Sequence, residues 1–535
     1  MDLTLIIVWI TTFIGFLIYR KIKGIYDDLE SMGIPYEGAL KGWMTMLKIF
    51  SSKEHFMNSI TDQYNRFKGQ QIIPSFSLTK RSFLIRDPAL VKQITTKDFD
   101  TFMNHDKNLN PDMDKLSGRM LFTLFDDEWR NMRNILSPIF TSSKMKMMFG
   151  ILADCTNDFT EHFEEKAKET GSMIMNCKES FSRFTVDGIC SAVLGFKGDC
   201  IKNEDSELFK FTMNLQKVDF WMFLKIIVFM VAHKLYVIFK LQLTRKDVYD
   251  FFYNAIVKVM KEREQNGIFR PDVIQLLMQA KKGQLKMQDK ENEVNEDELS
   301  NFSANIEYDV KAKNTKMTNW TDEHYMAQGM IFFLAGFDTT NILLQITTYS
   351  LAKNKDVQQK LIDEVDDVVV ALDGSQVTYE ALHKMKYLDM VISEALRYWP
   401  PAGEITRECS KDYNLKLDNG KTIKLKESDN ILIPTYAIHH DPKYYEDPEK
   451  FDPERFSDER KGSIVDGAYV PFGSGPRVCI GSRFALMEAK LLLFNILRKF
   501  TFEVCDKTPE KLELAPSLTN FELKSPIVVA LKLRN

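Results

Sequence analysis

The 535-residue chain is poor in cysteine: it has seven, and no two form a CxxC pair. Its eight histidines show no ligand spacing such as HxxxH. A disulfide framework and a histidine-based zinc site are therefore not predicted, and free thiols in a reducing compartment fit better. The chain also lacks a basic excess, because 71 Lys and Arg face 75 Asp and Glu for a net charge of −4. That balance disfavours nucleic-acid binding.

One long apolar run stands at the N-terminus. Residues 3–19 are almost wholly apolar, and Arg20, Lys21 and Lys23 follow at once. As a helix the run would span roughly 25 Å, enough for a thin bilayer, and the positive-inside rule would keep the rest cytoplasmic. A cleaved signal peptide would carry its basic residues before the apolar stretch. We therefore predict an uncleaved membrane anchor with its basic stop over residues 1–23.

The rest of the chain is predicted to form a loop-rich linker over residues 24–48 and one domain over residues 49–535. Two short β-branched runs within residues 71–86 predict a hairpin. Helical periodicity predicts helices over residues 129–152 with a break near Pro138, 178–194, 246–264, 321–351, 382–398 and 481–500. The fold class expected is mainly α with small β-sheets.

Two further segments stand out by their composition. Residues 224–239 are apolar but interrupted by charge, which fits either a buried helix or a segment lying on the bilayer surface. Residues 281–316 are polar and charge-rich with an acidic block, which indicates an exposed insertion.

A cysteine-containing loop carries the most specific signal. Residues 472–481 fit the pattern FxxGxRxCxG, with Phe472, Arg477 and Cys479 at the specified positions. The glycines allow a tight turn, and the helix expected next would lower the pKa of the thiol through its N-terminal N–H groups. Such a thiolate can bind iron and push electron density onto it. A structural cysteine is the alternative, but five matched positions arise by chance on the order of once in ten thousand such chains.

A second motif lies within a long apolar helix. Residues 335–340 read Ala-Gly-Phe-Asp-Thr-Thr. A mid-helix glycine costs about 1 kcal/mol, and an unpaired buried aspartate costs more. So many polar groups in one apolar turn indicate a function, although a bent helix or a polar core network is the structural alternative.

Three further charged groupings have little specificity alone. Glu394 and Arg397 are spaced i, i+3, and Trp129 and Arg133 are spaced i, i+4, so each pair shares a helix face. Arg455 follows within the sequence FDPERF. Surface helices often carry such pairs, so these motifs gain meaning only beside the cysteine loop.

With these motifs in this order, the chain resembles the cytochrome P450 haem-thiolate monooxygenases over essentially its whole length. It is most similar to the microsomal clan of insect detoxifying and vertebrate drug-metabolising members. The resemblance implies a large helical domain with a smaller β-rich region and an N-terminal transmembrane anchor. One departure is the segment after the anchor, which holds only Pro35 where microsomal members have several prolines.

The resemblance also implies residue roles. Cys479 would be the axial ligand of the iron of haem b, with Phe472 beside it in the cofactor-binding loop. The haem propionates would be bound by Trp129, Arg133, Arg407 and Arg477. Asp338 and Thr339 would relay protons to dioxygen, with room left by Ala335 and Gly336. A buried scaffold triad would be formed by Glu394, Arg397 and Arg455.

The implied activity is the insertion of one oxygen atom from O2 into lipophilic small molecules, either xenobiotic or endogenous. Electrons would come from NADPH through NADPH–cytochrome P450 reductase, at the cytoplasmic face of the endoplasmic reticulum membrane. Two other readings remain: a non-catalytic haem or ligand-binding protein, and an O2-independent haem-thiolate isomerase. The intact Asp338–Thr339 pair favours dioxygen cleavage, since only that reaction needs a proton relay.

Substrate contacts are expected from segments 101–122, 210–240, 331–340 and 400–406. Phe332, Phe333 and Phe337 would either shape an apolar pocket or belong to the core. The basic residues that could dock an acidic electron donor, or form only a solvated face, are Arg130, Lys144, Lys146 and Arg483.

Overall fold

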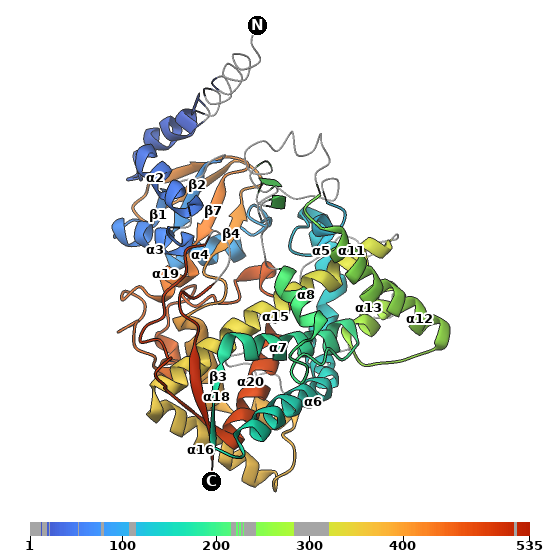
Figure 1. Cartoon of the computed structure of the whole chain (residues 1–535). Helices are drawn as coiled ribbons and strands as arrows, with labels where there is room; N and C mark the ends of the chain where they lie inside the picture. The colour runs from blue at the N-terminus through green and yellow to red at the C-terminus, as the bar shows by residue number, and fades with distance from the viewer. Residues whose placement is uncertain are drawn as a thin grey trace, which may run out of the picture.

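The computed structural model describes residues 22–51, 53–75, 80–105, 114–215, 242–282, 320–517 and 522–534, with residues 12, 16, 19–20, 221–222, 224–225 and 228. Helices make up most of the described chain (Figure 1). They are α2 Ala39–Phe50, α3 Phe56–Arg66, α4 Pro88–Lys92, α5 Asp126–Leu136, α6 Ser142–Ala167, α7 Cys177–Ile189, α8 Glu207–Leu215, α11 Lys246–Phe252, α12 Val259–Asn266, α13 Val273–Lys281, α15 Asp322–Lys353, α16 Lys355–Ala371, α17 Tyr379–His383, α18 Lys386–Tyr398, α19 Thr435–His439 and α20 Ser482–Lys499.

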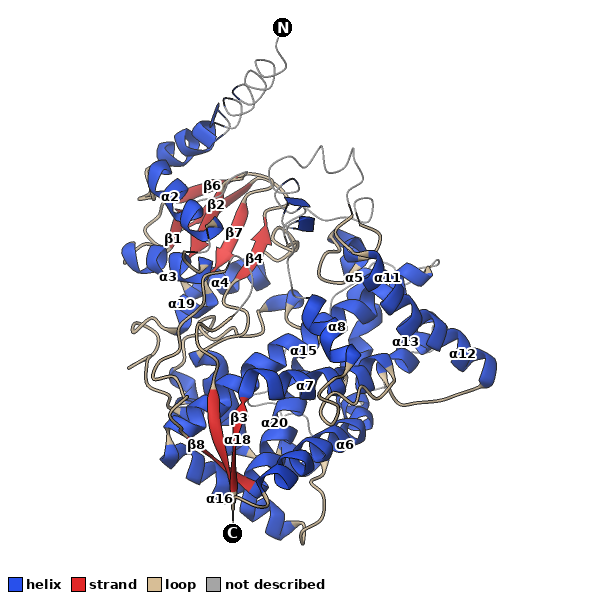
Figure 2. Ribbon diagram, in the orientation of Figure 1, coloured by secondary structure: helices blue, strands red, loops and turns tan. Residues whose placement is uncertain are grey.

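The strands form three small sheets, which Figure 2 shows in red at the periphery of the helices. The strands are β1 Ile72–Ser75, β2 Ser82–Ile85, β3 Ser172–Asn176, β4 Ile405–Glu408, β5 Tyr413–Lys416, β6 Thr422–Leu425, β7 Asn430–Ile433, β8 Phe500–Glu503 and β9 Val528–Leu533. The four-stranded sheet has the order β1-β2-β7-β4, in which β2 and β7 are parallel and the other pairs antiparallel. The other sheets are β3-β9-β8 and the hairpin β5-β6. A mainly helical fold with small sheets is as predicted.

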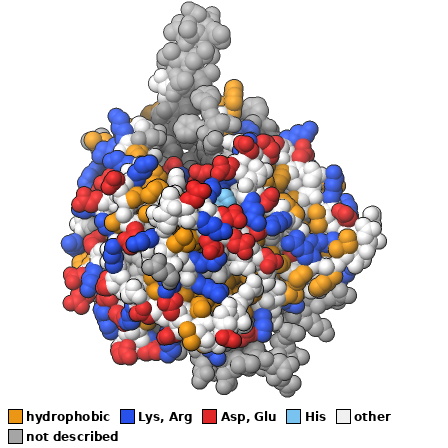
Figure 3. Space-filling model, turned by 60° about the horizontal axis from the view of Figure 1, so that its bottom comes forward, with side chains coloured by type: hydrophobic (Ala, Val, Ile, Leu, Met, Phe, Trp, Pro, Cys, Tyr) orange, Lys and Arg blue, Asp and Glu red, His pale blue; other side chains and the backbone are white. Residues whose placement is uncertain are grey.

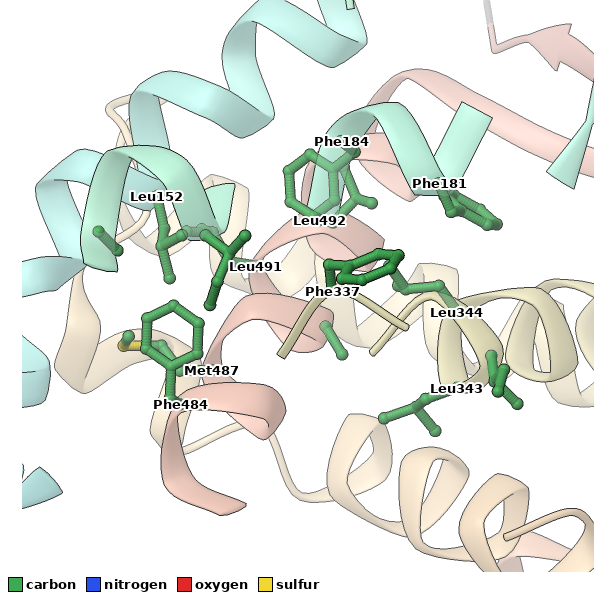
Figure 4. Close-up of a cluster of buried hydrophobic side chains, with 14 of the residues drawn as sticks. Leu152, Phe181, Phe184, Phe337, Leu343, Leu344, Phe484, Met487, Leu491 and Leu492 are labelled. Atoms are coloured by element: carbon green, nitrogen blue, oxygen red, sulfur yellow. The ribbon is translucent and has the colours of Figure 1, made fainter. Parts of the chain in front are cut away.

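Helix α15 runs through the middle of the helical part and packs against α7, α18 and α20. It is apolar on nearly all sides, as a helix surrounded by other helices must be. Figure 4 shows Phe337 and Leu344 of α15 among Phe181 and Phe184 of α7, with Leu492 of α20 nearby. These side chains belong to one large core cluster, and a second cluster lies around the four-stranded sheet.

Two glycines bring neighbouring helices close to α15. A Cβ at Gly336 would lie 2.5 Å from Ile189 Cδ1 of α7, and a Cβ at Gly329 would lie 2.2 Å from Ile256 Cδ1 of the π-helical turn η5 (Tyr253–Lys258). A larger residue at either position would force an isoleucine to move. The glycines therefore fix how closely α15 can be packed.

Several predicted elements are confirmed. β1 and β2 form the predicted hairpin, with Ile72 opposite Ile85. The break near Pro138 is present, because α5 ends at Leu136, a 3₁₀ turn covers Ser137–Phe140, and α6 begins at Ser142. The predicted helix over 382–398 is divided between α17 and α18, and α6 continues to Ala167.

The segment 24–48 is not loop-rich as predicted. Residues 22–31 are helical and α2 begins at Ala39, so the loop is confined to residues near Gly33 and Pro35. Asp28 explains the difference, because it pairs with Arg81 at 3.3 Å and with Lys426 at 2.5 Å. These contacts dock the helical segment against the sheet region, and such tertiary contacts override weak local signals.

The membrane predictions fall mostly outside the described residues. This holds for most of residues 1–23, for most of 224–239, and for nearly all of the insertion 281–316. Among the described residues, α15 is the helix whose length and composition would allow it to cross a membrane, but 67% of its most apolar window is buried inside the protein. It is therefore a core helix.

Candidate active site

The cysteine loop is held by two glycines in the left-handed conformation and by one close backbone contact. Gly473 and Gly475 have φ of 83° and 74°, a region that side chains other than glycine rarely adopt. A Cβ on Gly475 would lie 1.7 Å from the carbonyl oxygen of Thr95, so this position admits no other residue without movement of the backbone. The Cys479 N–H donates to the carbonyl of Phe472 at 2.9 Å and closes the loop.

The thiol of Cys479 borders an internal space. The residue keeps an exposed surface, yet the surrounding fold encloses it so fully that burial raises the pKa of the thiol. The N–H groups of Gly481 and Ser482, at the start of α20, and the charge of Arg133 act in the opposite direction. The predicted lowering by the helix N-terminus is present as a contribution, but burial outweighs it. A bound cation would favour the thiolate strongly.

Four predicted cofactor-binding residues come together near this thiol. Trp129 and Arg133 lie one turn apart on α5, Arg407 lies on β4, and Arg477 lies on the 3₁₀ turn Gly475–Arg477. The Arg477 guanidinium stacks 4.1 Å from the Trp129 ring. It donates to the carbonyls of Met103 at 2.9 Å and Leu124 at 2.8 Å, which fixes the turn to the chain before α5.

Arg407 adds a second anchored cation with spare donors. Its Nη1 donates to the carbonyl of Thr406 at 2.8 Å, and His105 Nδ1 lies 3.0 Å from the same oxygen. The Arg407 Nε is buried, and it has no hydrogen-bond partner in the part of the chain that the structure describes. An unpaired N–H at a buried charge is costly, so this donor indicates a missing acceptor.

The cluster is short of negative charge. Burial lowers the pKa of Arg133 and of Arg407 to about 10, with Cys479 opposing the effect at Arg133. At Arg477 burial acts together with Arg407 and Arg133 to lower the pKa, and Asp126 opposes them weakly. Three buried guanidiniums, of which Arg477 is repelled by the other two, fit a group carrying two carboxylates. A flat, dianionic, iron-bearing porphyrin beside Cys479 satisfies both the arginines and the thiol.

The motif on α15 faces two different spaces. Ala335 and Thr339 are exposed at an inner surface, and the Thr339 hydroxyl donates to the Ala335 carbonyl at 2.7 Å. Asp338 instead borders a separate cavity of about 230 Å³, with Lys178, Asn341 and Glu522 among its other lining residues. The two members of the predicted relay therefore do not open into the same space.

Gly336 does not leave the room expected of it. Its Cα faces Ile189 of α7, whose side chain fills the position that a Cβ would take. The glycine thus serves close helix packing, whereas Ala335 has the open surface. The sequence could not distinguish these two roles, because it does not show which helix packs against each of two adjacent positions.

The scaffold residues lie together in the interior. Arg397 Nε and Nη2 donate to the two carboxylate oxygens of Glu394 at 2.7 and 2.8 Å, and Arg455 Nε lies 3.5 Å from the same carboxylate. Asp452 N–H also donates to Glu394, at 2.8 Å. Burial alone would lower the pKa of Arg397, but its bonds to Glu394 raise it. The group is a paired network in the core.

The three phenylalanines of α15 are core residues. Phe332 contacts Phe140, Phe333 contacts Phe252, and all three candidates are buried. Of the two interpretations of Phe332, Phe333 and Phe337, the structure therefore supports the one in which they belong to the core. Aromatic rings of neighbouring helices bury these side chains. The spacing of the three residues in the sequence did not show whether they would be buried.

The basic residues proposed for docking are partly neutralised. Arg130 pairs with Asp100 at 2.5 Å, and Lys146 pairs with Glu380. Figure 3 shows Lys and Arg side chains interspersed with Asp and Glu over one face of the molecule. The ion pairs themselves favour the solvated-face interpretation for Arg130 and Lys146.

Sequence reasoning missed two polar residues of this region. His105 joins the arginine cluster, where burial, Arg407 and Arg477 lower its pKa. Glu488 on α20 is fully buried, and burial raises its pKa to about 8 with Thr340 opposing. A glutamate within the apolar sequence FALMEAKLLL was a visible signal for Glu488; His105 had none.

The fold and the arrangement of the cysteine and the arginines are those of a haem-thiolate protein. The family model described as Cytochrome P450 matches residues 38–526. The chain therefore belongs to the cytochrome P450 family of monooxygenases.

Curated relatives agree with this assignment. The chain is 38% identical to cytochrome P450 9e2 of Blattella germanica over 87% of this chain and 85% of that protein. It is 35% identical to probable cytochrome P450 9f2 of Drosophila melanogaster, over 97% of each. Cytochrome P450 9b2 of Drosophila melanogaster is 34% identical over 96% of each chain. The resemblance to insect members is confirmed.

Proposed function

We propose that this enzyme inserts one oxygen atom from O2 into lipophilic small molecules, with Cys479 as the iron ligand of haem b. The observation that carries the proposal is a cluster of three arginines, none of them in an ion pair with a carboxylate of the described residues, beside an enclosed thiol. The haem iron would have the thiol as its ligand, and the haem propionates would have the arginines as their counter-charges. When bound, haem supplies the activation of dioxygen, and the protein supplies its position and its protons.

The residue assignments follow from where the side chains lie. Arg133, Arg407 and Arg477 would bind the propionates, with Trp129 supporting Arg477 by stacking. Phe472 would hold the loop through its carbonyl bond to Cys479. Glu394, Arg397 and Arg455 would keep the loop's surroundings rigid.

The proton path would involve α15. Thr339 would hold a proton at its hydroxyl on the inner surface, while Asp338 would receive protons at its carboxylate from the separate cavity that it borders. Ala335 would leave space beside Thr339. This arrangement supports a monooxygenase over an isomerase, because an isomerase needs no such path.

The remaining parts concern partners and location. Electrons would come from NADPH through NADPH–cytochrome P450 reductase. The apolar run at residues 3–19, with its basic residues after it, supports an anchor in the endoplasmic reticulum membrane and a cytoplasmic catalytic domain. Lipophilic substrates, xenobiotic or endogenous, would then reach the enzyme from the bilayer.

The test is a reduced, carbon-monoxide difference spectrum of the purified enzyme and its Cys479→Ser variant. We expect the haem-thiolate band in the wild type and its loss in the variant, because an alcohol is a far weaker iron ligand than a thiolate. Cys505→Ser is the matched control, since that thiol lies outside the site and should leave the band unchanged. An unaltered band in Cys479→Ser would refute the assignment.

A further inference from the structure

A buried glutamine of helix α15 holds the loop that precedes α5. Gln328 is fully buried, and both polar groups of its side-chain amide are bonded to that loop. Its Oε1 accepts from the Leu121 N–H at 3.0 Å, and its Nε2 donates to the Arg119 carbonyl at 2.7 Å. Because one amide bonds two peptide groups of one short stretch, it fixes both the position and the orientation of the loop relative to α15.

The same loop supplies hydrogen-bond acceptors to Arg477. The Arg477 guanidinium donates to the carbonyls of Leu121 at 3.3 Å, Phe122 at 3.5 Å and Leu124 at 2.8 Å. Leu121 is the shared residue, because its N–H is bonded by Gln328 and its carbonyl by Arg477. Helix α15 is therefore connected to the guanidinium through a single residue of backbone.

The loop is hydrogen-bonded within itself between these two contacts. The Thr123 hydroxyl donates to the Ser117 carbonyl at 2.6 Å, and the Thr123 N–H donates to the Met120 carbonyl at 2.9 Å. The buried Asp114 carboxylate accepts from the Ser117 N–H at 2.8 Å and holds the start of the loop. A loop braced in this way moves as a unit, so a displacement at α15 also displaces the carbonyls that accept from the guanidinium.

Gln328 lies on the same stripe of α15 as the residues at the inner surface. Ala335 and Thr339 follow it by seven and eleven residues, and both are exposed at that surface. Residues at these spacings lie within about 20° of one another around an α-helix, and seven residues span about 10 Å along its axis. One stripe of α15 thus carries the amide that holds the loop and, two turns further on, the motif proposed to serve dioxygen.

The bonds of Arg477 leave a donor for a ligand. A guanidinium has five N–H groups, and this one makes four hydrogen bonds to carbonyls, the three above and one to Met103 at 2.9 Å. The position of these carbonyls decides where the remaining N–H points. Resting on the proposed function, in which Arg477 binds a haem propionate, we propose that Gln328 is a positioning residue for Arg477. Its amide holds the loop so that the guanidinium is aimed at the propionate before haem binds.

The experiment compares matched variants of two buried glutamines. Gln328→Met keeps the length of the side chain and removes both hydrogen bonds to the loop. Gln358→Met is the control, because the Gln358 amide on α16 bonds the backbone of Phe502 in β8 in the same manner, accepting from its N–H at 2.7 Å and donating to its carbonyl at 2.9 Å. Haem release to an acceptor protein and chemical unfolding are measured for both holoenzymes.

We expect Gln328→Met to release haem about fivefold faster than the wild type, which corresponds to about 1 kcal/mol. Gln358→Met should release haem at the wild-type rate within about twofold, although both variants lose a similar amount of stability to unfolding. Haem release thus separates positioning of Arg477 from a general loosening of the fold.

A second comparison tests whether Gln328 acts through Arg477. Arg477→Lys keeps the charge but removes the fixed fork of donors. In that background Gln328→Met should accelerate haem release by less than about twofold, because two changes that remove the same contact are not additive. If Arg477→Lys does not retain haem, the comparison is made with haem dimethyl ester, whose esterified propionates carry no charge. The acceleration should again fall below about twofold.

The proposal is overturned if Gln328→Met releases haem at the wild-type rate or if Gln358→Met accelerates release equally. It is also overturned if the acceleration is undiminished in Arg477→Lys or with the ester. Any of these results beside a normal carbon-monoxide band refutes only the role of Gln328. Absence of the haem-thiolate band refutes the proposed function, while release of the bound haem still reports on Gln328.

Discussion

Two groups of buried charge in this enzyme are built in opposite ways. In the Glu394 network a buried carboxylate lies between two arginines: each of its oxygens accepts from Arg397, Arg455 Nε lies 3.5 Å away, and Asp452 adds a backbone N–H. In the cluster of Arg133, Arg407 and Arg477 no arginine forms an ion pair with a carboxylate of the described residues, and Arg407 and Arg133 lower the pKa of Arg477. The first arrangement contains its own counter-charge and serves the fold. The second is incomplete by itself and indicates a ligand of opposite charge.

Removing Glu394 should have the largest effect. Glu394→Ala leaves Arg397 buried without its partner, and breaking a buried pair costs about 3–5 kcal/mol. We expect a chain that unfolds at much lower denaturant or fails to accumulate in soluble form, measured by chemical unfolding of the purified protein. Glu454→Ala, which breaks a partly exposed pair with Lys360, is the comparison and should cost under about 1 kcal/mol. A similar loss in the free energy of unfolding in both variants would contradict the difference expected between buried and exposed ion pairs.

Glu488 tests an intermediate case, a buried acid that has no cationic partner among the residues that the structure describes. Its pKa of about 8 lies above that of a free glutamate, so the folded state keeps the proton while the unfolded state loses it. Stability from this group is present below about pH 4.5 and is lost progressively as the pH rises to about 8. Glu488→Gln should remove that loss and gain on the order of 3–4 kcal/mol at pH 8 relative to pH 5.

Chemical unfolding of wild type and Glu488→Gln at both pH values measures this difference. The exposed Glu262→Gln serves as control, because it should leave the pH dependence of unfolding as in the wild type. Parallel pH profiles for wild type and Glu488→Gln would mean that Glu488 ionises normally in the folded protein.

Arg407 should show the smallest change in stability and a selective change in cofactor retention. Arg407→Met removes one of three repelling charges and keeps the apolar volume, so the free energy of unfolding should change by less than about 1 kcal/mol. Haem should leave the variant about tenfold faster, a loss of about 1.4 kcal/mol of binding. Haem transfer to an acceptor protein measures the rate. A large loss of stability without faster haem release would place Arg407 with the scaffold network instead.

The sequence predicted the parts of the site that lie within short motifs. The FxxGxRxCxG loop and the paired Glu394 and Arg397 were found because their spacing is local, and the hairpin at β1 and β2 followed from two β-branched runs. Contacts between distant segments could not be found this way. His105 reaches Arg407 across some 300 residues, and Gly336 faces Ile189 rather than the inner surface. The segment 24–48 was misjudged for the same reason, since Asp28 is held by residues far along the chain.

The close fit of Gly329 and Gly336 against two isoleucines limits how the substrate selectivity of the enzyme can change by substitution. Because α15 has no spare volume on that side, it cannot be shifted to accept a larger guest, and a side chain added there would disturb the core before it altered selectivity. We therefore expect new selectivity to arise from strand ends and loops such as residues 400–406, while the central helix stays the same.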